Sequence, residues 1–276
     1  ILKNTLSSPS LKPVEKYQSE IFVDNEKCTP FLRWAGGKRW MLKQLHNYLP
    51  VSGFNQYHEP FIGGGSVFFH LQPERAFISD LNKELIDAYI AVQQDVELVV
   101  DFLKGFKNTE EDYYQIRAAK FDDFFQEAAR FIYLNQTSFN GIYRVNLNGE
   151  YNVPYGKRHD FKFNYDNLRG ASLNLKNTDF SSGDFSNIMK NVKEGDLVFL
   201  DPPYTVTHNS NGFIQYNQKI FSLSEQYRLS EMIDKIKDIG AYYILTNAAH
   251  PEVVNIFQKD DPIFEVSRSS TIGGIG

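Results

Sequence analysis

The sequence contains one cysteine, no long apolar run and no excess of positive charge, and each of these absences narrows the class of protein. Cys28 has no partner for an intrachain disulfide and argues against a cysteine-based metal site. No apolar run approaches the roughly 20 residues that a membrane span needs. Residues 1–10 lack the long apolar stretch of a secretory signal. We therefore expect a cytoplasmic protein with no membrane span, no disulfide and no metal ion.

The chain does contain enough apolar material for a large core. Its 276 residues are 42% hydrophobic, which suits one large α/β domain or a core with an insert. The formal net charge of −5 argues weakly against a nucleic-acid partner, but a duplex responds to local charge and not to the average.

Local charge is different in residues 135–162. This segment has four basic residues against two acidic ones, and five aromatic residues lie among them. Basic groups interleaved with aromatic rings are suited to holding phosphates and stacking on bases. The alternative is an ordinary aromatic-rich surface loop.

Hydrophobic spacing predicts a sheet that is interrupted by an insert. A strand at 56–61, a glycine turn at 62–65, a helix at 66–71 capped by Ser66, a strand at 76–80 and a helix at 82–94 form a βαβ order. Residues 95–134 are predicted to be wholly helical. Asn148-Gly149 then predicts a hairpin between 143–146 and 150–153.

The remaining segments complete the predicted organisation. We expect strands at 196–200 and 239–246 with a helix at 224–238 between them, and an extended polar arm at 1–29. Residues 268–274 are typical of a loop that leads into one further strand, so we expect the chain to lack that strand.

Residues 201–204 read Asp-Pro-Pro-Tyr and follow an apolar run, which is typical of a buried strand that delivers a site at its carboxyl end. The prolines restrict the backbone, so that Asp201 and Tyr204 take set directions and the carbonyls of Asp201 and Pro202 can point outward. A carboxylate, a carbonyl and an aromatic face together suit a planar base held by its exocyclic amino group. The alternative is a strand-ending turn.

The turn from Phe61 to Gly65 lies between a predicted strand and a predicted helix. Glycines allow a ligand to approach the backbone, and a helix N-terminus offers unpaired N–H groups. Asp80 ends the next strand, where a carboxylate can accept both hydroxyls of a ribose. Position 68 is Phe, not the third glycine of the dinucleotide pattern, which favours a nucleoside cofactor without a pyrophosphate. A plain glycine turn is the alternative.

Residues 31–38, Phe-Leu-Arg-Trp-Ala-Gly-Gly-Lys, form a third candidate segment. Trp34 can cover an adenine ring or a sulfonium, and a cation over an indole face gains about 1 kcal/mol. Lys38 is similar to a phosphate-binding lysine, but Leu32 and Arg39 break the Walker spacing. This disfavours a nucleotide hydrolase.

Four segments, taken in their order along the chain, resemble the Dam-type DNA adenine-N6 methyltransferases of the D12 class, which include the DpnII and EcoRV modification enzymes. The resemblance covers residues 30–270. The segments are Arg33-Trp34-Ala35-Gly36-Gly37-Lys38, Glu59-Pro60-Phe61-Ile62-Gly63-Gly64-Gly65, residues 139–146 with 151–156, and Asp201-Pro202-Pro203-Tyr204.

The resemblance implies an α/β class I S-adenosylmethionine-dependent methyltransferase with a Rossmann-like sheet and an inserted helical and β-hairpin DNA-recognition domain. The implied division is an N-terminal arm at 1–29, a catalytic domain at 30–94 and 170–276, and a target-recognition insert at 95–169.

The resemblance also assigns roles to individual residues. Those implied in catalysis are Asp201, Pro202 and Tyr204, and those implied in cofactor binding are Trp34, Lys38, Phe61, Gly63, Gly65, Asp80 and Asp201. Those implied in DNA binding are Phe139, Asn140, Ile142, Arg144 and Pro154. Phe139 matches an aromatic that inserts into the duplex, and Arg144 is a candidate for reading a guanine. The alternatives are a core aromatic for Phe139 and a phosphate contact for Arg144.

The implied reaction is direct methyl transfer from S-adenosylmethionine to N6 of an adenine flipped out of double-stranded DNA within GATC. No metal or membrane takes part, the context is bacterial or phage, and a cognate restriction endonuclease can belong to the same system without direct contact. Two alternatives stay open. One is a methyltransferase for cytosine N4 or an RNA base, and the other is a catalytically silent DNA-binding subunit.

Overall fold

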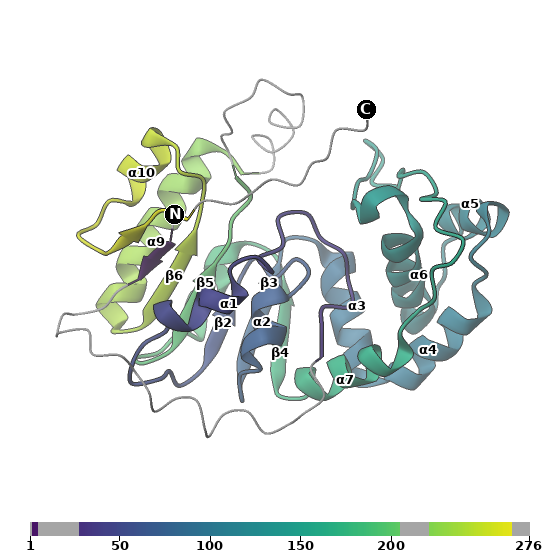
Figure 1. The fold of residues 1–276 in the computed structure, drawn as a ribbon, viewed down its shortest axis with the longest axis horizontal. Helices are drawn as coiled ribbons and strands as arrows, with labels where there is room; N and C mark the ends of the chain where they lie inside the picture. Colours follow the sequence, from purple (N-terminus) through teal and green to yellow (C-terminus); the bar gives the residue numbers. More distant parts are fainter. Residues whose placement is uncertain (1, 5–27, 205–220, 267–276) are drawn as a thin grey trace. The chain divides into compact units, whose positions relative to one another are not determined.

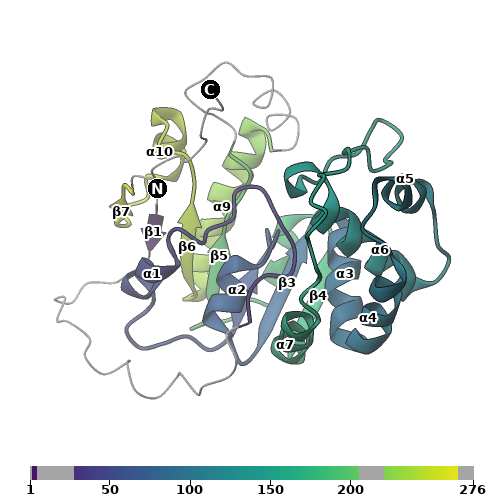
Figure 2. The same ribbon diagram turned by 45° about the vertical axis from the view of Figure 1, so that its right-hand side comes forward.

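The structure, a computed structural model, describes residues 2–4, 28–204 and 221–266, and its strands form one sheet in the order β4-β3-β2-β5-β6-β1-β7 (Figures 1 and 2). The five parallel strands are β4 (Thr178–Ser182), β3 (Ala76–Asp80), β2 (Tyr57–Glu59), β5 (Leu197–Leu200) and β6 (Tyr242–Thr246). The strand β1 (Leu2–Asn4) is antiparallel to β6 and to β7 (Ile263–Phe264). This sheet confirms the predicted α/β class.

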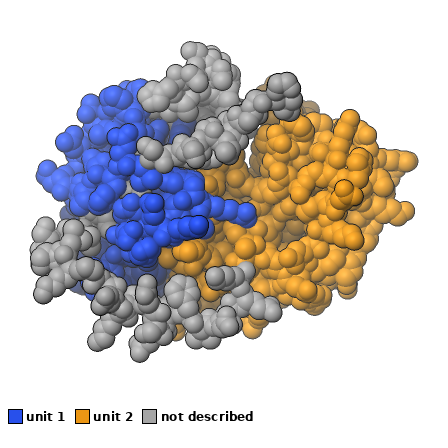
Figure 3. Space-filling view, in the orientation of Figure 1, with its two compact units in different colours: residues 1–13, 39–58, 189–276 blue, residues 14–38, 59–188 orange. Residues whose placement is uncertain are grey.

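Contacts along the chain divide it into two compact units, which Figure 3 shows in different colours. Unit 1 comprises residues 1–13, 39–58 and 189–276, and unit 2 comprises residues 14–38 and 59–188. This division follows packing. The predicted division into a catalytic domain and a recognition insert follows function, and it stays a prediction.

Unit 1 is built on the buried strands β5 and β6. All four residues of β5 are buried, as expected for a parallel strand that is covered on both faces. Among its described residues, this unit has the helices α1 (Leu42–Leu45), η1 (His46–Tyr48), α9 (Leu223–Ile239) and α10 (Pro251–Phe257). Helix α9 packs on β6 and on α10. The fully buried large side chains of this unit include Tyr57, Tyr243, Phe199 and Phe257.

Unit 2 joins β3 and β4 to a group of helices. These are α2 (Ser66–Leu71), α3 (Lys83–Gln94), α4 (Val96–Gly105), α5 (Glu110–Ala118), α6 (Phe124–Thr137), η2 (Phe139–Gly141) and α7 (Tyr165–Leu175), and η3 (Phe185–Lys190) follows β4. Helix α6 packs against α3, α4 and α5, and α7 packs against α3 and α4 (Figures 1 and 2). The fully buried aromatic side chains here include Tyr89, Tyr113 and Tyr133.

The predicted strand–turn–helix–strand order around the glycine turn is confirmed, with one difference at the start of α2. Gly65, at φ +70°, is the N-cap of this helix, and within the described part of the chain no side chain caps it. The predicted cap by Ser66 is therefore wrong, because Ser66 is already the first helical residue.

The prediction that residues 95–134 are wholly helical is wrong, because residues 106–109 and 119–123 are not helical. Three helices occupy this stretch, α4, α5 and α6, and each begins at its own polar cap. The side chains of Asp95, Thr109 and Asp123 accept the N–H groups of Leu98, Asp112 and Gln126. A capping residue takes non-helical backbone angles, so a helix cannot continue through it.

The predicted hairpin is confirmed as a turn with limited pairing. Val145 and Tyr151 form an isolated antiparallel bridge. Asn146 N donates to Glu150 O at 2.8 Å, and the Asn146 side chain accepts the N–H groups of Asn148 and Glu150 at 2.9 Å each. Gly149 has φ +78°, as the predicted turn requires.

Most of the predicted arm, residues 1 and 5–27, and the predicted carboxyl-terminal loop, residues 268–274, lie outside the described residues. The beginning of the predicted arm, Leu2–Asn4, is the strand β1.

Candidate functional site

In unit 2, the glycine turn at 61–65 is tied to the carboxyl end of β3. Ile62 N donates to Ser79 O at 3.2 Å, and Gly63 N donates to Asp80 Oδ2 at 3.1 Å. Asp80 Oδ1 accepts the N–H of Asn82 at 3.0 Å. Burial raises the pKa of Asp80, and these backbone N–H groups oppose that shift. The carboxylate is therefore fixed at the end of β3, where sequence reasoning expected an acceptor.

The glycines of this turn are required by packing as well as by conformation. A Cβ on Gly63, at φ +47°, would lie 2.6 Å from Trp34 Cδ1. A Cβ on Gly65, at φ +70°, would lie 2.9 Å from the Tyr89 hydroxyl, which donates to Gly63 O at 3.0 Å. The space that was predicted to admit a ligand next to the backbone at these two positions is thus already filled by Trp34 and Tyr89. Contact of Gly63 and Gly65 with a cofactor stays a prediction.

Lys38 places a cation in the loop that follows Trp34. It is only 4% exposed, and its Nζ donates to Gly36 O at 2.8 Å. Gly36 has φ +82°, a conformation that glycine adopts without strain, which lets the loop turn back toward the lysine. A buried ammonium of this kind suits an anionic group on a ligand.

The carboxyl end of β4 adds two residues that sequence reasoning missed, Asp184 and Phe185. Gly183 N donates to Asp80 O at 2.9 Å, which joins this end to the end of β3. Asp184 Oδ1 accepts the N–H of Ser186 at 3.0 Å, and the Phe185 ring stacks on Phe61 at 5.4 Å. The signal available in the sequence was the Gly-Asp-Phe that follows the segment 178–182. Neighbouring parallel strands end at one edge of the sheet, which is where ligands bind in this class of fold.

Asp201 lies in unit 1, directly after β5, as predicted. Thr246, the last residue of β6, donates its hydroxyl to Asp201 Oδ1 at 2.5 Å. Asp201 and Tyr204 are half-buried and Pro202 is buried. Thr246 is a further residue that sequence reasoning missed, because only the pairing of Leu200 with Leu245 brings position 246 to the end of β5.

The predicted DNA-contacting residues lie on the surface of unit 2. Phe139 is 53% exposed, and Asn140, Arg144 and Pro154 are also exposed, while Ile142 is half-buried. The structure therefore rules out the core-aromatic alternative for Phe139. Phe139 N donates to Pro154 O at 2.9 Å, which brings two of these residues together.

Arg144 is held in one orientation by the opposite side of the hairpin. Its Nε donates to Asn152 Oδ1 at 2.7 Å, and a terminal nitrogen donates to Asn152 O at 3.2 Å. A guanidinium fixed in this way has lost side-chain freedom before any ligand binds, which favours specific recognition.

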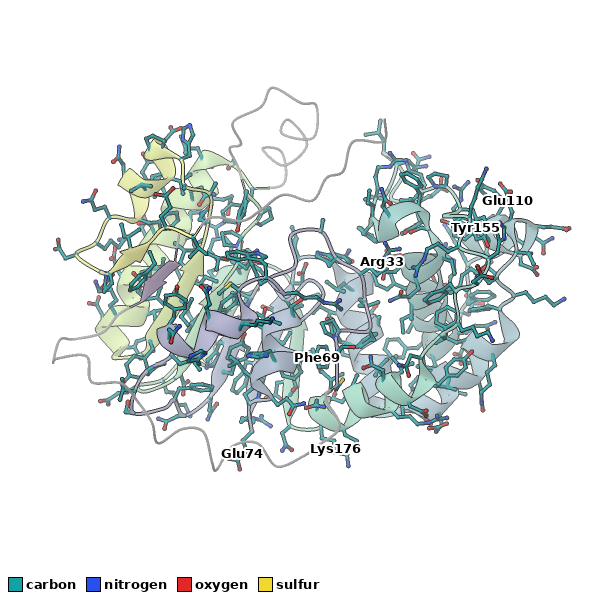
Figure 4. All side chains as sticks on the ribbon, in the orientation of Figure 1. Arg33, Phe69, Glu74, Glu110, Tyr155 and Lys176 are labelled. Atoms are coloured by element: carbon teal, nitrogen blue, oxygen red, sulfur yellow. The ribbon has the colours of Figure 1, made fainter. Side chains whose placement is uncertain are left out.

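Arg33 connects the Trp34 loop to helix α6 and is labelled in Figure 4. Asn135 on α6 accepts the Arg33 N–H at 2.8 Å and donates to Arg33 O at 2.7 Å. A Cβ on Gly141 would lie 2.6 Å from Arg33 Nε. Burial, followed by the charge of Arg158, lowers the pKa of Arg33. The candidate cofactor loop and the candidate DNA-binding segment are thus in direct contact.

Within residues 2–4, 28–204 and 221–266, no group of three or more His, Cys, Asp or Glu side chains could hold a metal ion. No helix in the same ranges is long and apolar enough to cross a membrane.

Comparison with known proteins identifies the family. The profile of the D12 class N6 adenine-specific DNA methyltransferases matches residues 34–272. The type II methyltransferase M1.LlaDCHI of Lactococcus lactis subsp. cremoris is 33% identical over 255 residues, which cover 88% of this chain and 89% of the relative. The type II methyltransferase M.MjaIII of Methanocaldococcus jannaschii is 35% identical over 246 residues, covering 79% and 84%. The DNA adenine methylase of Escherichia coli is 31% identical over 228 residues, covering 80% and 81%. The chain therefore belongs to the D12 class of N6 adenine-specific DNA methyltransferases.

Proposed function

We propose that this adenine-specific DNA methyltransferase uses S-adenosylmethionine and transfers its methyl group directly to N6 of an adenine that is flipped out of the duplex. The observation that carries the proposal is the Asp-Pro-Pro-Tyr segment at the end of β5, with its carboxylate fixed by Thr246. A fixed carboxylate beside a rigid backbone is suited to hold an amino group on a planar ring.

The side chains of unit 2 fit the chemistry of S-adenosylmethionine. Asp80 offers a fixed carboxylate to the ribose hydroxyls, and Lys38 offers a cation to the carboxylate of the amino-acid part. Trp34 and Phe61 offer aromatic faces to the adenine or the sulfonium. Gly63 and Gly65 shape the turn beside them, and Asp201 is proposed to contribute from the end of β5. When bound, S-adenosylmethionine supplies an electrophilic methyl group on a sulfonium.

Asp201, Pro202 and Tyr204 are proposed to prepare the target nitrogen. The N6 lone pair of adenine is delocalised into the ring, which makes it a poor nucleophile. Asp201 and the Pro202 carbonyl accept hydrogen bonds from the two N6 hydrogens, which draws the nitrogen toward tetrahedral geometry and localises the lone pair. Tyr204 stacks on the flipped ring, and flipping itself costs a few kcal/mol.

The exposed segment from Phe139 to Pro154 is proposed to bind the duplex. Phe139 inserts between bases, and Arg144 reads a guanine in the major groove. Asn140, Ile142 and Pro154 contact the adjoining base pairs. GATC is the proposed site, because residues 139–156 resemble the corresponding segment of GATC readers. This segment belongs to the target-recognition insert that we propose at 95–169, between the arm at 1–29 and the catalytic domain at 30–94 and 170–276.

The biological setting is also a proposal. Two relatives are named as type II methyltransferases, so a cognate restriction endonuclease of the same system, without direct contact, is a candidate partner. An enzyme that modifies cellular or phage DNA would work in the cytoplasm.

The test uses labelled S-adenosylmethionine and two duplexes that differ only in a GATC site, one of them scrambled. After digestion, N6-methyladenine from the GATC duplex alone would support the chemistry, the cofactor and the site. N6-methyladenine from both duplexes would support the adenine target and contradict the proposed GATC specificity. Label in cytosine would contradict the adenine target, and duplex binding without label would favour a silent subunit. An RNA version of the duplex is tested in parallel, and label in that RNA alone would favour the RNA-base alternative.

The catalytic assignment has its own variant. Asp201→Ala should abolish transfer and leave duplex binding measurable, whereas Asp238→Ala, which removes an exposed carboxylate on α9, should leave transfer unchanged. An active Asp201→Ala enzyme would contradict the proposed role.

A further inference from the structure

We infer that Tyr143 is a positioning residue that couples the DNA-recognition segment, residues 139–146, to the cofactor side of unit 2 through Trp34. The inference rests on the function proposed above. It concerns a residue that the sequence analysis counted only among the aromatic rings of 135–162. The family resemblance gave Tyr143 no role of its own, although it lies between two predicted DNA contacts, Ile142 and Arg144.

Tyr143 turns toward the protein, whereas Arg144 beside it is exposed. The Tyr143 ring stacks on Trp34 with centroids 5.6 Å apart and an angle of 22° between the ring planes. It also contacts the rings of Phe131 and Tyr151 at 5.7 and 5.8 Å. Tyr143 therefore links the recognition segment to the predicted cofactor tryptophan.

The hydroxyl of Tyr143 makes a second connection. It donates to Glu84 Oε2 at 2.7 Å. Glu84 lies in the first turn of α3, the helix that begins just after Asp80 and Asn82. Burial, followed by the contact with Glu84, raises the pKa of Tyr143, so the hydroxyl keeps its proton and remains a donor at physiological pH.

Trp34 continues the connection to the glycine turn. A Cβ on Gly63 would lie 2.6 Å from Trp34 Cδ1, and one on Gly64 would lie 3.2 Å from Trp34 Cβ, so the side chain lies directly against this turn. Gly63 N donates in turn to Asp80 Oδ2 at 3.1 Å. A continuous set of contacts thus runs from Tyr143 through Trp34 and Gly63 to the carboxylate proposed to hold the ribose.

These contacts have a thermodynamic consequence. DNA bound to the recognition segment would favour the arrangement in which Tyr143 stacks on Trp34 and Trp34 lies against the glycine turn. A cofactor that needs Trp34 in this position would favour the same arrangement, so each ligand would raise the affinity for the other by the same factor. We expect a factor of about 5 or more, the lower end of typical coupling between two sites.

The experiment measures the dissociation constant of S-adenosylhomocysteine, which binds without reacting, by calorimetry with and without a saturating GATC duplex. The wild-type enzyme is compared with Tyr143→Ala, Tyr143→Phe and Tyr143→Leu. Tyr114→Ala is the matched control, because Tyr114 is an exposed tyrosine of the same unit with ring contacts of its own. Thermal unfolding of each variant shows whether it is folded.

We expect the duplex to raise wild-type affinity by about 5-fold or more, and Tyr143→Ala to reduce this ratio to near 1 while weakening S-adenosylhomocysteine binding on its own. Tyr143→Phe should keep most of the coupling because it keeps the stacked ring, and Tyr114→Ala should match the wild type. If Tyr143→Ala does not fold, Tyr143→Leu keeps a large apolar side chain without an aromatic face and should show the same loss of coupling.

The contrary results separate the two proposals. An undiminished ratio in folded Tyr143→Ala or Tyr143→Leu would overturn the coupling role and leave the proposed function intact. A wild-type enzyme that binds both ligands without coupling would do the same. A wild-type enzyme that binds neither ligand would overturn the proposed function itself.

Discussion

Thr246 and Asp201 lie at the ends of neighbouring parallel strands and are joined by a hydrogen bond of 2.5 Å from the threonine hydroxyl to the carboxylate. The bond limits rotation of the Asp201 carboxylate. An acceptor with a fixed orientation needs no reorganisation when an adenine amino group arrives, and such preorganisation is where an enzyme of this type gains rate.

The first prediction concerns that bond. Thr246→Val keeps the shape of the side chain and removes the donor. A hydrogen bond to a charged group contributes about 1.5–3 kcal/mol, so we expect the rate of methyl transfer to fall roughly 10- to 100-fold. The KM values for DNA and cofactor should change little, because the bond orients Asp201 and does not itself bind either substrate.

Single-turnover transfer with labelled cofactor measures this effect without contributions from product release. Thr246→Ser is the matched variant, since it keeps the hydroxyl and loses only a methyl group, and it should retain most of the rate. A Thr246→Val enzyme that transfers methyl as fast as the wild type would show that Asp201 needs no such anchor.

The second prediction concerns the contact of Gly63 with Trp34. Gly63→Ala would place a Cβ 2.6 Å from the indole and force alanine into φ +47°. A strained backbone position of this kind costs about 1–3 kcal/mol, and Trp34 would have to move. We expect S-adenosylhomocysteine affinity to fall on the order of 10-fold or more.

Calorimetric titration of the folded variant measures this loss. Gly105→Ala is the matched control, because Gly105 is an exposed glycine at the end of α4, where an added Cβ would meet nothing within 4 Å beyond its own helix backbone and chain neighbours. It should bind as the wild type does. Unchanged affinity in Gly63→Ala would mean that the turn adapts and that Trp34 does not depend on it.

Features that depend on neighbouring residues were predictable from the sequence. The Asp-Pro-Pro-Tyr segment follows a buried strand as expected, because apolar content and proline restriction are local properties. The turn at Asn148-Gly149 forms for the same reason, since glycine favours the positive φ that the turn requires. Asp80 likewise ends its strand as predicted.

Contacts between distant residues were not predictable in this way. The bond between Thr246 and Asp201 spans 45 positions and depends on which strands are neighbours. The stacking of Tyr143 on Trp34 accompanies the hydrogen bonds that tie the neighbouring Arg33 to Asn135 on α6, and no periodicity specifies these contacts. The prediction for residues 95–134 was wrong for another reason. The polar residues that cap the three helices are present in the sequence, but the hydrophobic spacing continues across them and gives no sign of the helix boundaries.

The third prediction concerns base recognition. Arg144 is exposed and oriented by Asn152 at 2.7 Å, so Arg144→Ala removes a preoriented donor pair. We expect a loss of about 1–3 kcal/mol of discrimination at one base pair of the site. Competition between GATC duplexes with single base-pair changes measures it, and Asn152→Ala should show a smaller loss at the same position. A uniform loss across all duplexes would make Arg144 a phosphate contact.

The last prediction concerns acid stability and a buried pair in unit 1. His58 Nε2 lies 2.8 Å from Asp196 Oδ2, with both side chains almost fully buried. Burial lowers the pKa of His58 below its ordinary value of 6.5, and this outweighs the contact with Asp196, which raises it. Above pH 6.5 the histidine is neutral in the folded and the unfolded chain, so it adds no pH dependence.

As the pH falls below that value, the unfolded chain binds a proton that the folded chain does not. The free energy of unfolding should therefore decrease by up to about 1.4 kcal/mol per pH unit, until the pH reaches the lowered pKa of the folded state. Urea unfolding at pH 7.5 and at pH 5.5, values chosen about one unit on either side of the ordinary histidine pKa, measures the decrease.

His58→Gln should be less stable than the wild type at both pH values because it disturbs a buried pair, yet its stability should depend less on pH than that of the wild type. His46→Gln, which changes an exposed histidine of the same unit, should keep the wild-type dependence. An equal pH dependence in His58→Gln and the wild type would mean that other groups, and not His58, set the acid sensitivity of this unit.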